Sequence, residues 1–278
     1  MLVASSGIFP ESGGIETLLP PVIGHRGAAA YAPENTLAGL RKAKALGCRW
    51  VEFDVRLTAD NQPILLHDDR LERTTNGRGG VSGLQFATVR RYDAGNWFHS
   101  SFAGERVPTL EEALLLLAEL GLGANVELKA VRGREAATGA VVAELLARTW
   151  PNNPAHLLIS SFQRASLAAA RDRAPHIARG ILFRHIPKNW RNIAAQLGCV
   201  TIHADQQRLR PAVLSEIRRA GYPLLAYTVN DPERAKILFD FGVKSVFSDF
   251  PDRLHGAAAC GGFHREIVVD SASVAIPR

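Results

Sequence analysis

The feature that most constrains the fold of this 278-residue chain is an alternation of short β-branched or apolar runs with longer amphipathic segments. Such alternation is typical of repeated βα units around a parallel sheet. A closed barrel of these units has eight parallel strands, and the sequence offers one candidate more than that. The candidate strands are residues 22–27, 50–58, 63–68, 124–129, 157–162, 180–183, 200–204, 224–229 and 245–250.

The surplus strand is explained by the gap between the second and third candidates. Only residues 59–62 separate them, whereas a parallel crossover needs about a dozen residues or more. These two strands must therefore form a hairpin, which leaves eight parallel strands. We predict an α/β fold, a (β/α)₈ barrel or TIM barrel, with helices between the strands. The first helix is expected to start at Pro33 and Asn35 and to end at Gly47.

Three further segments define the expected domain organisation. The connection 69–109 is too long for a simple loop, so it predicts a small inserted subdomain after the second strand, close to the mouth of the barrel. The barrel itself is expected to occupy residues 21–255. Residues 1–20 lack the basic start and apolar core of a signal peptide and are interpreted as a flexible leader. Residues 256–278 form a C-terminal extension, in which residues 267–269 could add a strand.

Charge and cysteine content narrow the possible partners. The 33 Lys and Arg and 27 Asp and Glu give a net charge of +6, but the basic residues are scattered, which argues against a nucleic-acid partner and weakly favours a small anionic one. No apolar stretch approaches the roughly 18 residues that span a bilayer, so stable membrane association is not expected. Cys48, Cys199 and Cys260 lack the spacing of a disulfide framework or zinc site, which favours a reducing, cytoplasmic location.

Charged side chains cluster where the predicted strands end. In a barrel of this kind, residues at the carboxyl ends of the strands face the active site. The first, second and third parallel strands and the returning strand of the hairpin all carry such residues, so they are expected to meet at one rim. They are His25, Arg26, Glu52, Asp54, His67, Glu127 and Lys129.

The acidic members of this set indicate a metal site. Glu52 and Asp54 are two residues apart on a strand, so their side chains project to the same face, about 7 Å apart along the backbone. Two adjacent buried carboxylates repel each other, and a cation would offset that repulsion. With Glu127 they form an all-oxygen set suited to one divalent cation, Mg²⁺ or Ca²⁺. Salt bridges to neighbouring basic side chains are the competing interpretation.

The basic members and the histidines indicate what the site does. Arg26 and Lys129 could hold an anion, and a phosphodiester would bring the formal charge of the loaded site to zero. His25 and His67, with ordinary pKa values near 6.5, could serve as general base and general acid.

The remaining candidates line the pocket or are set aside. Phe162 and Tyr227 could pack against the alcohol portion of a substrate, and His203 could also line the pocket. Ser160 and Ser161 lack the context of a nucleophile elbow, so a serine hydrolase is rejected.

Taken together, these motifs resemble the glycerophosphodiester phosphodiesterase family, over residues 22–254. The likeness is closest to the short cytosolic bacterial enzymes. The motifs that carry it are His25-Arg26-Gly27, Pro33-Glu34-Asn35-Thr36, Glu52-Phe53-Asp54, His67-Asp68-Asp69, Arg73-Thr74-Thr75-Asn76-Gly77, Glu127-Leu128-Lys129, Tyr227-Thr228-Val229-Asn230 and Ser248-Asp249-Phe250-Pro251.

The resemblance implies metal-dependent hydrolysis of glycerophosphodiesters to sn-glycerol 3-phosphate and an alcohol. It implies the roles inferred above: the acids as metal ligands, the basic residues as phosphate-holding groups and the histidines as acid and base. It adds Asn35 as a residue that supports the site by holding one of these groups. Two alternatives remain open: a phosphodiesterase of the sphingomyelinase D type, and a catalytically silent phosphate-binding barrel.

Overall fold

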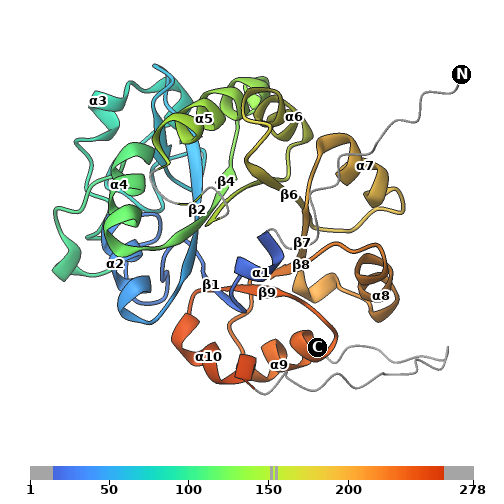
Figure 1. Ribbon diagram of the computed structural model, residues 1–278. Helices are drawn as coiled ribbons and strands as arrows, with labels where there is room; N and C mark the ends of the chain where they lie inside the picture. Colours follow the sequence, from blue (N-terminus) through green and yellow to red (C-terminus); the bar gives the residue numbers. More distant parts are fainter. Residues whose placement is uncertain (1–14, 151–152, 154–155, 260–278) are drawn as a thin grey trace, which may run out of the picture.

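Eight parallel strands close into a barrel in the computed structural model, which describes residues 15–150, 153 and 156–259. Figure 1 looks along the barrel, with the helices in a ring outside the strands. Closure follows from β1, which pairs with β9 on one side and with β2 on the other. The parallel strands are β1 (Val22–Gly24), β2 (Trp50–Leu57), β4 (Gly123–Leu128), β5 (Leu157–Ser161), β6 (Ala178–Phe183), β7 (Thr201–Asp205), β8 (Leu224–Tyr227) and β9 (Ser245–Ser248).

The expected hairpin is also present. Strand β3 (Pro63–Leu65) runs antiparallel to β2, with Val55 opposite Leu65 and Leu57 opposite Pro63. All nine predicted runs are therefore strands, and the TIM-barrel prediction is confirmed.

The helices lie between the strands, as the alternation predicts. They are α2 (Leu37–Ala45), α4 (Leu110–Leu120), α5 (Glu135–Thr149), α6 (Arg164–Arg173), α7 (Trp190–Leu197), α8 (Pro211–Arg219), α9 (Pro232–Asp240) and α10 (Pro251–Ala259).

The predicted start of the first helix is wrong. Helix α2 begins at Leu37, and Thr36 caps it by accepting a 3.1 Å hydrogen bond from the amide of Gly39. Asn35 cannot belong to the helix because its backbone is left-handed, with φ of 56°. Proline at position 33 thus belongs to the loop that leads into the helix.

The base of the barrel is closed by a segment that was expected to belong to the leader. Helix α1 (Ile15–Leu18) lies over the centre of the ring in Figure 1. Ile15 and Leu19 pack against side chains inside the barrel, among them Trp50 and Phe247. The reason is their spacing, since apolar residues four apart share one helix face. Residues 15–20 therefore cover the apolar barrel interior.

At the other end of the chain, helix α10 extends to Ala259, past the expected boundary at residue 255. The possible strand at 267–269 lies outside the described residues. Within the part of the chain that is described, no helix has the length and apolar character needed to cross a membrane.

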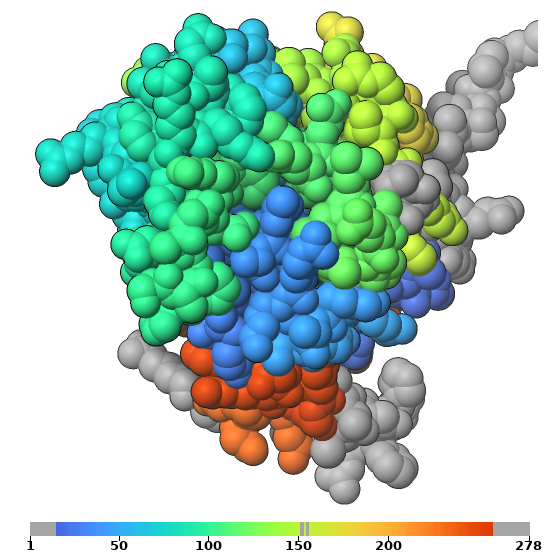
Figure 2. All heavy atoms as spheres, turned by 90° about the vertical axis from the view of Figure 1, so that its left-hand side faces the viewer, coloured from blue at the N-terminus to red at the C-terminus, as the bar shows by residue number. Residues whose placement is uncertain are grey.

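The insertion between β3 and α4 has a small core of its own. It contains only short helices, η1 (Val81–Gly83), α3 (Phe86–Val89) and η2 (Ser100–Phe102). Figure 2 shows it, in cyan and teal, standing beside α2 and α4 on one side of the barrel. The Arg90 guanidinium holds Glu112 of α4 through two hydrogen bonds of 2.5 and 2.6 Å. The core of the insertion includes Ile64 of β3, together with Leu66, Leu71, Val81, Val89, Ala94 and Val107.

The close approach of α5 and α6 gives a test of the helix layer. A Cβ added at Gly139 of α5 would overlap the backbone carbonyl of Ser166 in α6. We expect Gly139→Ala to destabilise the protein by about 1–3 kcal/mol through overpacking, measured by urea unfolding. Gly256→Ala in α10 is the matched control, because a Cβ there meets no atom of the described residues within 4 Å. Equal stability of the two variants would contradict the packing described.

Candidate active site

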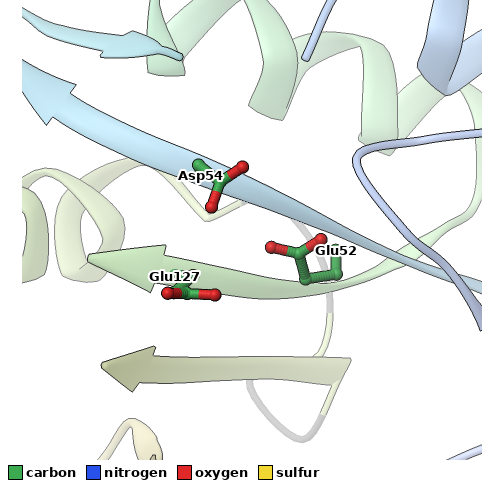
Figure 3. Close-up of side chains that lie close together, drawn as sticks. All are labelled: Glu52, Asp54 and Glu127. Atoms are coloured by element: carbon green, nitrogen blue, oxygen red, sulfur yellow. The ribbon is translucent and has the colours of Figure 1, made fainter. Parts of the chain in front are cut away.

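Three carboxylates meet inside one end of the barrel. Glu52 and Asp54 project from β2 and Glu127 from β4, and the register of the two strands places Asp54 opposite Glu127. One oxygen from each residue lies within 4.8 Å of the others, and Figure 3 shows the three carboxylates converging. The residues are 2%, 1% and 7% exposed. The predicted acidic cluster is therefore present and buried.

The electrostatics of the cluster show that its charge is under-compensated. Burial and the nearby Asp54 charge raise the pKa of Glu52 to about 8. Burial also raises the pKa of Glu127, whereas at Asp54 the effect of burial is outweighed by Lys129 and Arg26, which hold its pKa below the ordinary value. A group whose charged form is disfavoured by its own neighbours is a natural ligand for an added cation.

Donor chemistry supports the same conclusion. Glu52 Oε1 is buried and has no hydrogen bond among the described residues. Carboxylate oxygens are the ligands that hard divalent cations prefer. The residues present therefore fit a divalent cation held by this triad.

The two basic residues lie against the acids. Arg26 Nε is 3.3 Å from Asp54 Oδ2, and the Arg26 amide donates a 3.0 Å hydrogen bond to Glu52 Oε2. Lys129 Nζ is 2.6 Å from Glu127 Oε1 and 3.4 Å from Asp54 Oδ1. The salt bridges of the competing interpretation thus exist. When all three carboxylates are ionised, they outnumber these two basic groups.

Asn35 fixes the orientation of Asp54. Its amide donates a 2.9 Å hydrogen bond to Asp54 Oδ2, and its carbonyl accepts a 3.0 Å bond from the Asp54 backbone amide. The left-handed backbone of Asn35 directs the side chain toward β2, and asparagine tolerates that conformation better than most residues. Asn35 is placed where it can hold one carboxylate of the triad.

His25 follows β1 and lies between two acids. Its Nδ1 is 2.6 Å from Asp249 Oδ1, and its Nε2 is 3.9 Å from Glu52 Oε2. Asn230 holds Asp249 with a 2.8 Å hydrogen bond. Burial lowers the pKa of His25, but the hydrogen bond to Asp249 and the charge of Glu52 outweigh it, so the net shift is upward.

His67 follows β3, the strand that pairs with the strand of Glu52 and Asp54. The backbone hydrogen bond from Leu66 to Asp54 places it there, and its Nδ1 lies 2.7 Å from Asp68 Oδ1. Burial lowers its pKa. Both imidazoles thus have an acid at Nδ1, which sets the tautomer and leaves Nε2 for other contacts.

The two acids beside the imidazoles, Asp68 and Asp249, were not predicted as site residues from the sequence, although both lie in its motifs. Asp249 directly follows β9 and Asp68 lies beyond the end of β3, so position at a strand end was the available signal.

The predicted aromatic pair forms a wall next to Lys129. The rings of Phe162 and Tyr227 are 5.8 Å apart and nearly perpendicular, and Lys129 Nζ is 5.5 Å from the centre of the Phe162 ring. Phe162 is 40% exposed, so it is accessible from the mouth. Tyr227 donates a 3.0 Å hydrogen bond to the carbonyl of Phe183, which fixes its ring.

His203, in contrast, lies in the barrel interior. It has no solvent exposure, and its Nε2 is 3.0 Å from Thr201 Oγ1. The expectation that it lines the pocket is not supported by these contacts. The two serines considered as nucleophiles are also fully buried.

The barrel and these side chains define a class: a (β/α)₈ barrel with a buried acidic triad at one end. Residues 25–253 match the model of the glycerophosphoryl diester phosphodiesterase family, and the chain belongs to that family. It is 31% identical over 242 residues to the glycerophosphodiester phosphodiesterase of Caldanaerobacter subterraneus subsp. tengcongensis, which covers 87% of this chain and 98% of that relative.

Solved structures agree with this assignment. A phosphodiesterase of Oleispira antarctica, in complex with the product sn-glycerol-3-phosphate, has a TM-score of 0.85 at 40% identity, over 88% of this chain and 99% of that one. A glycerophosphodiester phosphodiesterase of Agrobacterium tumefaciens has a TM-score of 0.70 at 29% identity, over 87% and 100% of the two chains. The resemblance drawn from the motifs is confirmed, and the chain is an enzyme of this family.

Burial of His203 predicts how stability depends on pH. Burial lowers its pKa to about 3 from an ordinary value near 6.5. Below about 6.5 the unfolded chain binds a proton that the folded chain does not, so stability is lost as the pH falls. From pH 7 to pH 5 the loss is about 2 kcal/mol.

Urea unfolding at both pH values measures this loss. His203→Gln should remove most of it, whereas His176→Gln, which changes an exposed histidine, should keep it. An unchanged pH dependence in His203→Gln would contradict the prediction.

Proposed function

We propose that this enzyme hydrolyses glycerophosphodiesters to sn-glycerol 3-phosphate and an alcohol, in a reaction that depends on one divalent cation, Mg²⁺ or Ca²⁺. The observation that carries the proposal is the buried triad flanked by Arg26, Lys129 and two imidazoles, each paired with an acid. The product named for the Oleispira antarctica structure supports the choice of substrate.

Glu52, Asp54 and Glu127 would hold the cation. When bound, it would polarise a phosphoryl oxygen and lower the pKa of a coordinated hydroxyl group. The fit rests on the all-oxygen donors, on their convergence, and on Glu52 Oε1, which has no hydrogen bond among the described residues.

Arg26 and Lys129 would hold the phosphate. Each already lies beside a carboxylate, so the carboxylate offsets its desolvation, while remaining N–H groups can donate to an anion. With the cation present, the loaded site accepts a single negative charge, which is the charge of a phosphodiester. Phe162 and Tyr227 would contact the glycerol or alcohol portion next to Lys129.

His25 and His67 would transfer the protons. One imidazole takes the proton from the attacking hydroxyl, either the glycerol 2-OH or water, and the other donates a proton to the oxygen of the departing alcohol. Asp249 and Asp68 orient the two rings and stabilise each imidazolium as it forms. If the 2-OH attacks, the cyclic phosphate is opened by water with the roles reversed.

A cytoplasmic location belongs to the same proposal. Cys48 and Cys199 are buried free thiols, and burial raises the pKa of each to about 12, so neither is reactive. Unpaired, inert thiols suit a reducing compartment.

Removal of the cation tests the proposal directly. The purified enzyme should release sn-glycerol 3-phosphate from glycerophosphocholine, lose this activity in EDTA and regain it with Mg²⁺ or Ca²⁺. The restoring ion should also raise the melting temperature of the wild type but not that of Asp54→Asn, because the ion binds only the folded protein. Turnover that resists the chelator would remove the cation from the mechanism.

A second substrate tests the alternative activity. An enzyme of the sphingomyelinase D type would prefer lysophosphatidylcholine, so preference for that substrate over glycerophosphocholine would contradict the proposal.

Substitution of the histidines tests the proton transfers. His25→Ala and His67→Ala should each lower kcat by at least about 100-fold, since a positioned acid or base contributes about 10²–10⁴. Their melting temperatures, and the increase caused by the cation, should stay close to those of the wild type. His99→Ala, an exposed histidine in the insertion, is the control. Near-normal kcat in either active-site variant would refute its role.

A further inference from the structure

One arginine of the insertion binds two carboxylates at the mouth of the barrel. Arg73 Nη1 and Nη2 donate hydrogen bonds of 2.7 and 2.8 Å to the two oxygens of Glu34, in the loop between β1 and α2. Arg73 Nε and Nη2 donate bonds of 2.6 and 3.0 Å to the two oxygens of Asp68, just beyond β3. A single guanidinium thus joins two loops that start from different strands.

Each of these carboxylates has a second partner in the active site. Glu34 Oε1 accepts a 2.7 Å hydrogen bond from Arg26 Nη1, and Asp68 Oδ1 is 2.7 Å from His67 Nδ1. A continuous set of charge-assisted contacts therefore runs from Arg26 through Glu34, Arg73 and Asp68 to His67. It links a phosphate-holding residue to one of the two imidazoles.

The charges make Arg73 the centre of this set. Hydrogen bonds from Arg73 are the main reason that the pKa of Asp68 is lowered to about 2. At Glu34, burial is outweighed by Arg73 and Arg26, so its pKa also falls. Without Arg73, Glu34 and Asp68 would lose the guanidinium that lies between them. Lysine cannot replace it fully, because a point charge cannot form two forked pairs at once.

We propose that Arg73 is a positioning residue for catalysis: it orients His67 through Asp68 and Arg26 through Glu34. The inference rests on the proposed function, since it gives His67 and Arg26 their roles in the reaction. It also gives the insertion a specific task, because the insertion supplies the group that fixes one side of the active site.

The insertion does not depend on Arg73 to stay attached to the barrel. It has its own apolar core, and Arg90 anchors it to α4 through the two bonds to Glu112. Arg90 is the matched control, because it is also a half-exposed arginine that forms a forked pair between the insertion and the barrel. Unlike Arg73, it donates its hydrogen bonds to Glu112 and to the carbonyl of Val107, neither of which is a proposed active-site residue.

The experiment compares Arg73→Ala, Arg73→Lys and Arg90→Ala with the wild type. For Arg73→Ala we expect kcat/KM for glycerophosphocholine to fall by about 10- to 100-fold, the usual effect of losing a residue that orients a catalytic group. Arg73→Lys should recover only part of this loss, and Arg90→Ala should stay within about threefold of the wild type. Added guanidinium at millimolar concentration should raise the activity of Arg73→Ala, whereas an equal concentration of NaCl should not.

A double-mutant cycle identifies the route of the effect. Asp68→Asn should mainly lower kcat and Glu34→Gln should mainly raise KM. The combination of Arg73→Ala with Asp68→Asn should then cost less than the product of the two single effects, because both remove the same contact. The proposal would be overturned if the fold-losses of the two single variants multiply in the double variant. Equal losses of kcat/KM in Arg73→Ala and Arg90→Ala would also overturn it.

Melting temperatures show whether a loss of activity reflects local or global change. If Arg73→Ala does not fold, Arg73→Gln, which keeps the stem and an amide donor, is measured in its place against the same criteria. Failure of the proposed function has a separate signature, which is normal turnover in His67→Ala. Loss in His67→Ala together with wild-type activity in both Arg73 variants overturns only the role of Arg73.

Discussion

Repulsion between three buried carboxylates governs the structure of this active site. The register of β2 and β4 brings Glu52, Asp54 and Glu127 together, with one oxygen of each within 4.8 Å of the others. Most of the polar contacts around them act to offset that repulsion. Arg26 and Lys129 compensate part of the charge, Asn35 holds one carboxylate, and the raised pKa of Glu52 favours its neutral form. A divalent cation held by the triad, as proposed above, would compensate the charge of its ionised form.

The residues of the site come from two kinds of segment. The acids and Lys129 lie on or directly after parallel strands, where backbone pairing fixes them, whereas His67, Asp68 and Arg73 come from the end of the hairpin and the insertion. At the opposite end, helix α1 and Leu19 pack apolar side chains against the barrel interior. The charged groups and this apolar packing therefore lie at opposite ends of the barrel.

The sequence predicted the strands and the acidic triad because both depend on local rules. Buried parallel strands read as apolar runs, and residues two apart on a strand share a face. The start of α2 was predicted wrongly because Pro33 and Asn35 satisfy the composition of a helix start, while the conformation of Asn35 is set by its contact with Asp54, 19 residues away. The pairing of His25 with Asp249 spans 224 residues, and no local pattern can choose such a partner. The packing of Ile15 and Leu19 likewise depends on the folded barrel, because the side chains that they contact come together only there.

The pairing of β2 with β4 also protects the molecule against misfolding. A slip of one residue in β2 would turn Phe53 and Val55 toward the mouth and drive Glu52 and Asp54 into the apolar layer beneath the helices. Two ionised groups there would have no partners, so the misaligned state would be much higher in free energy than the native one. The residues that would carry out the chemistry therefore also disfavour incorrect strand alignment. A barrel closed in the wrong register would bury carboxylates without partners and would be unstable.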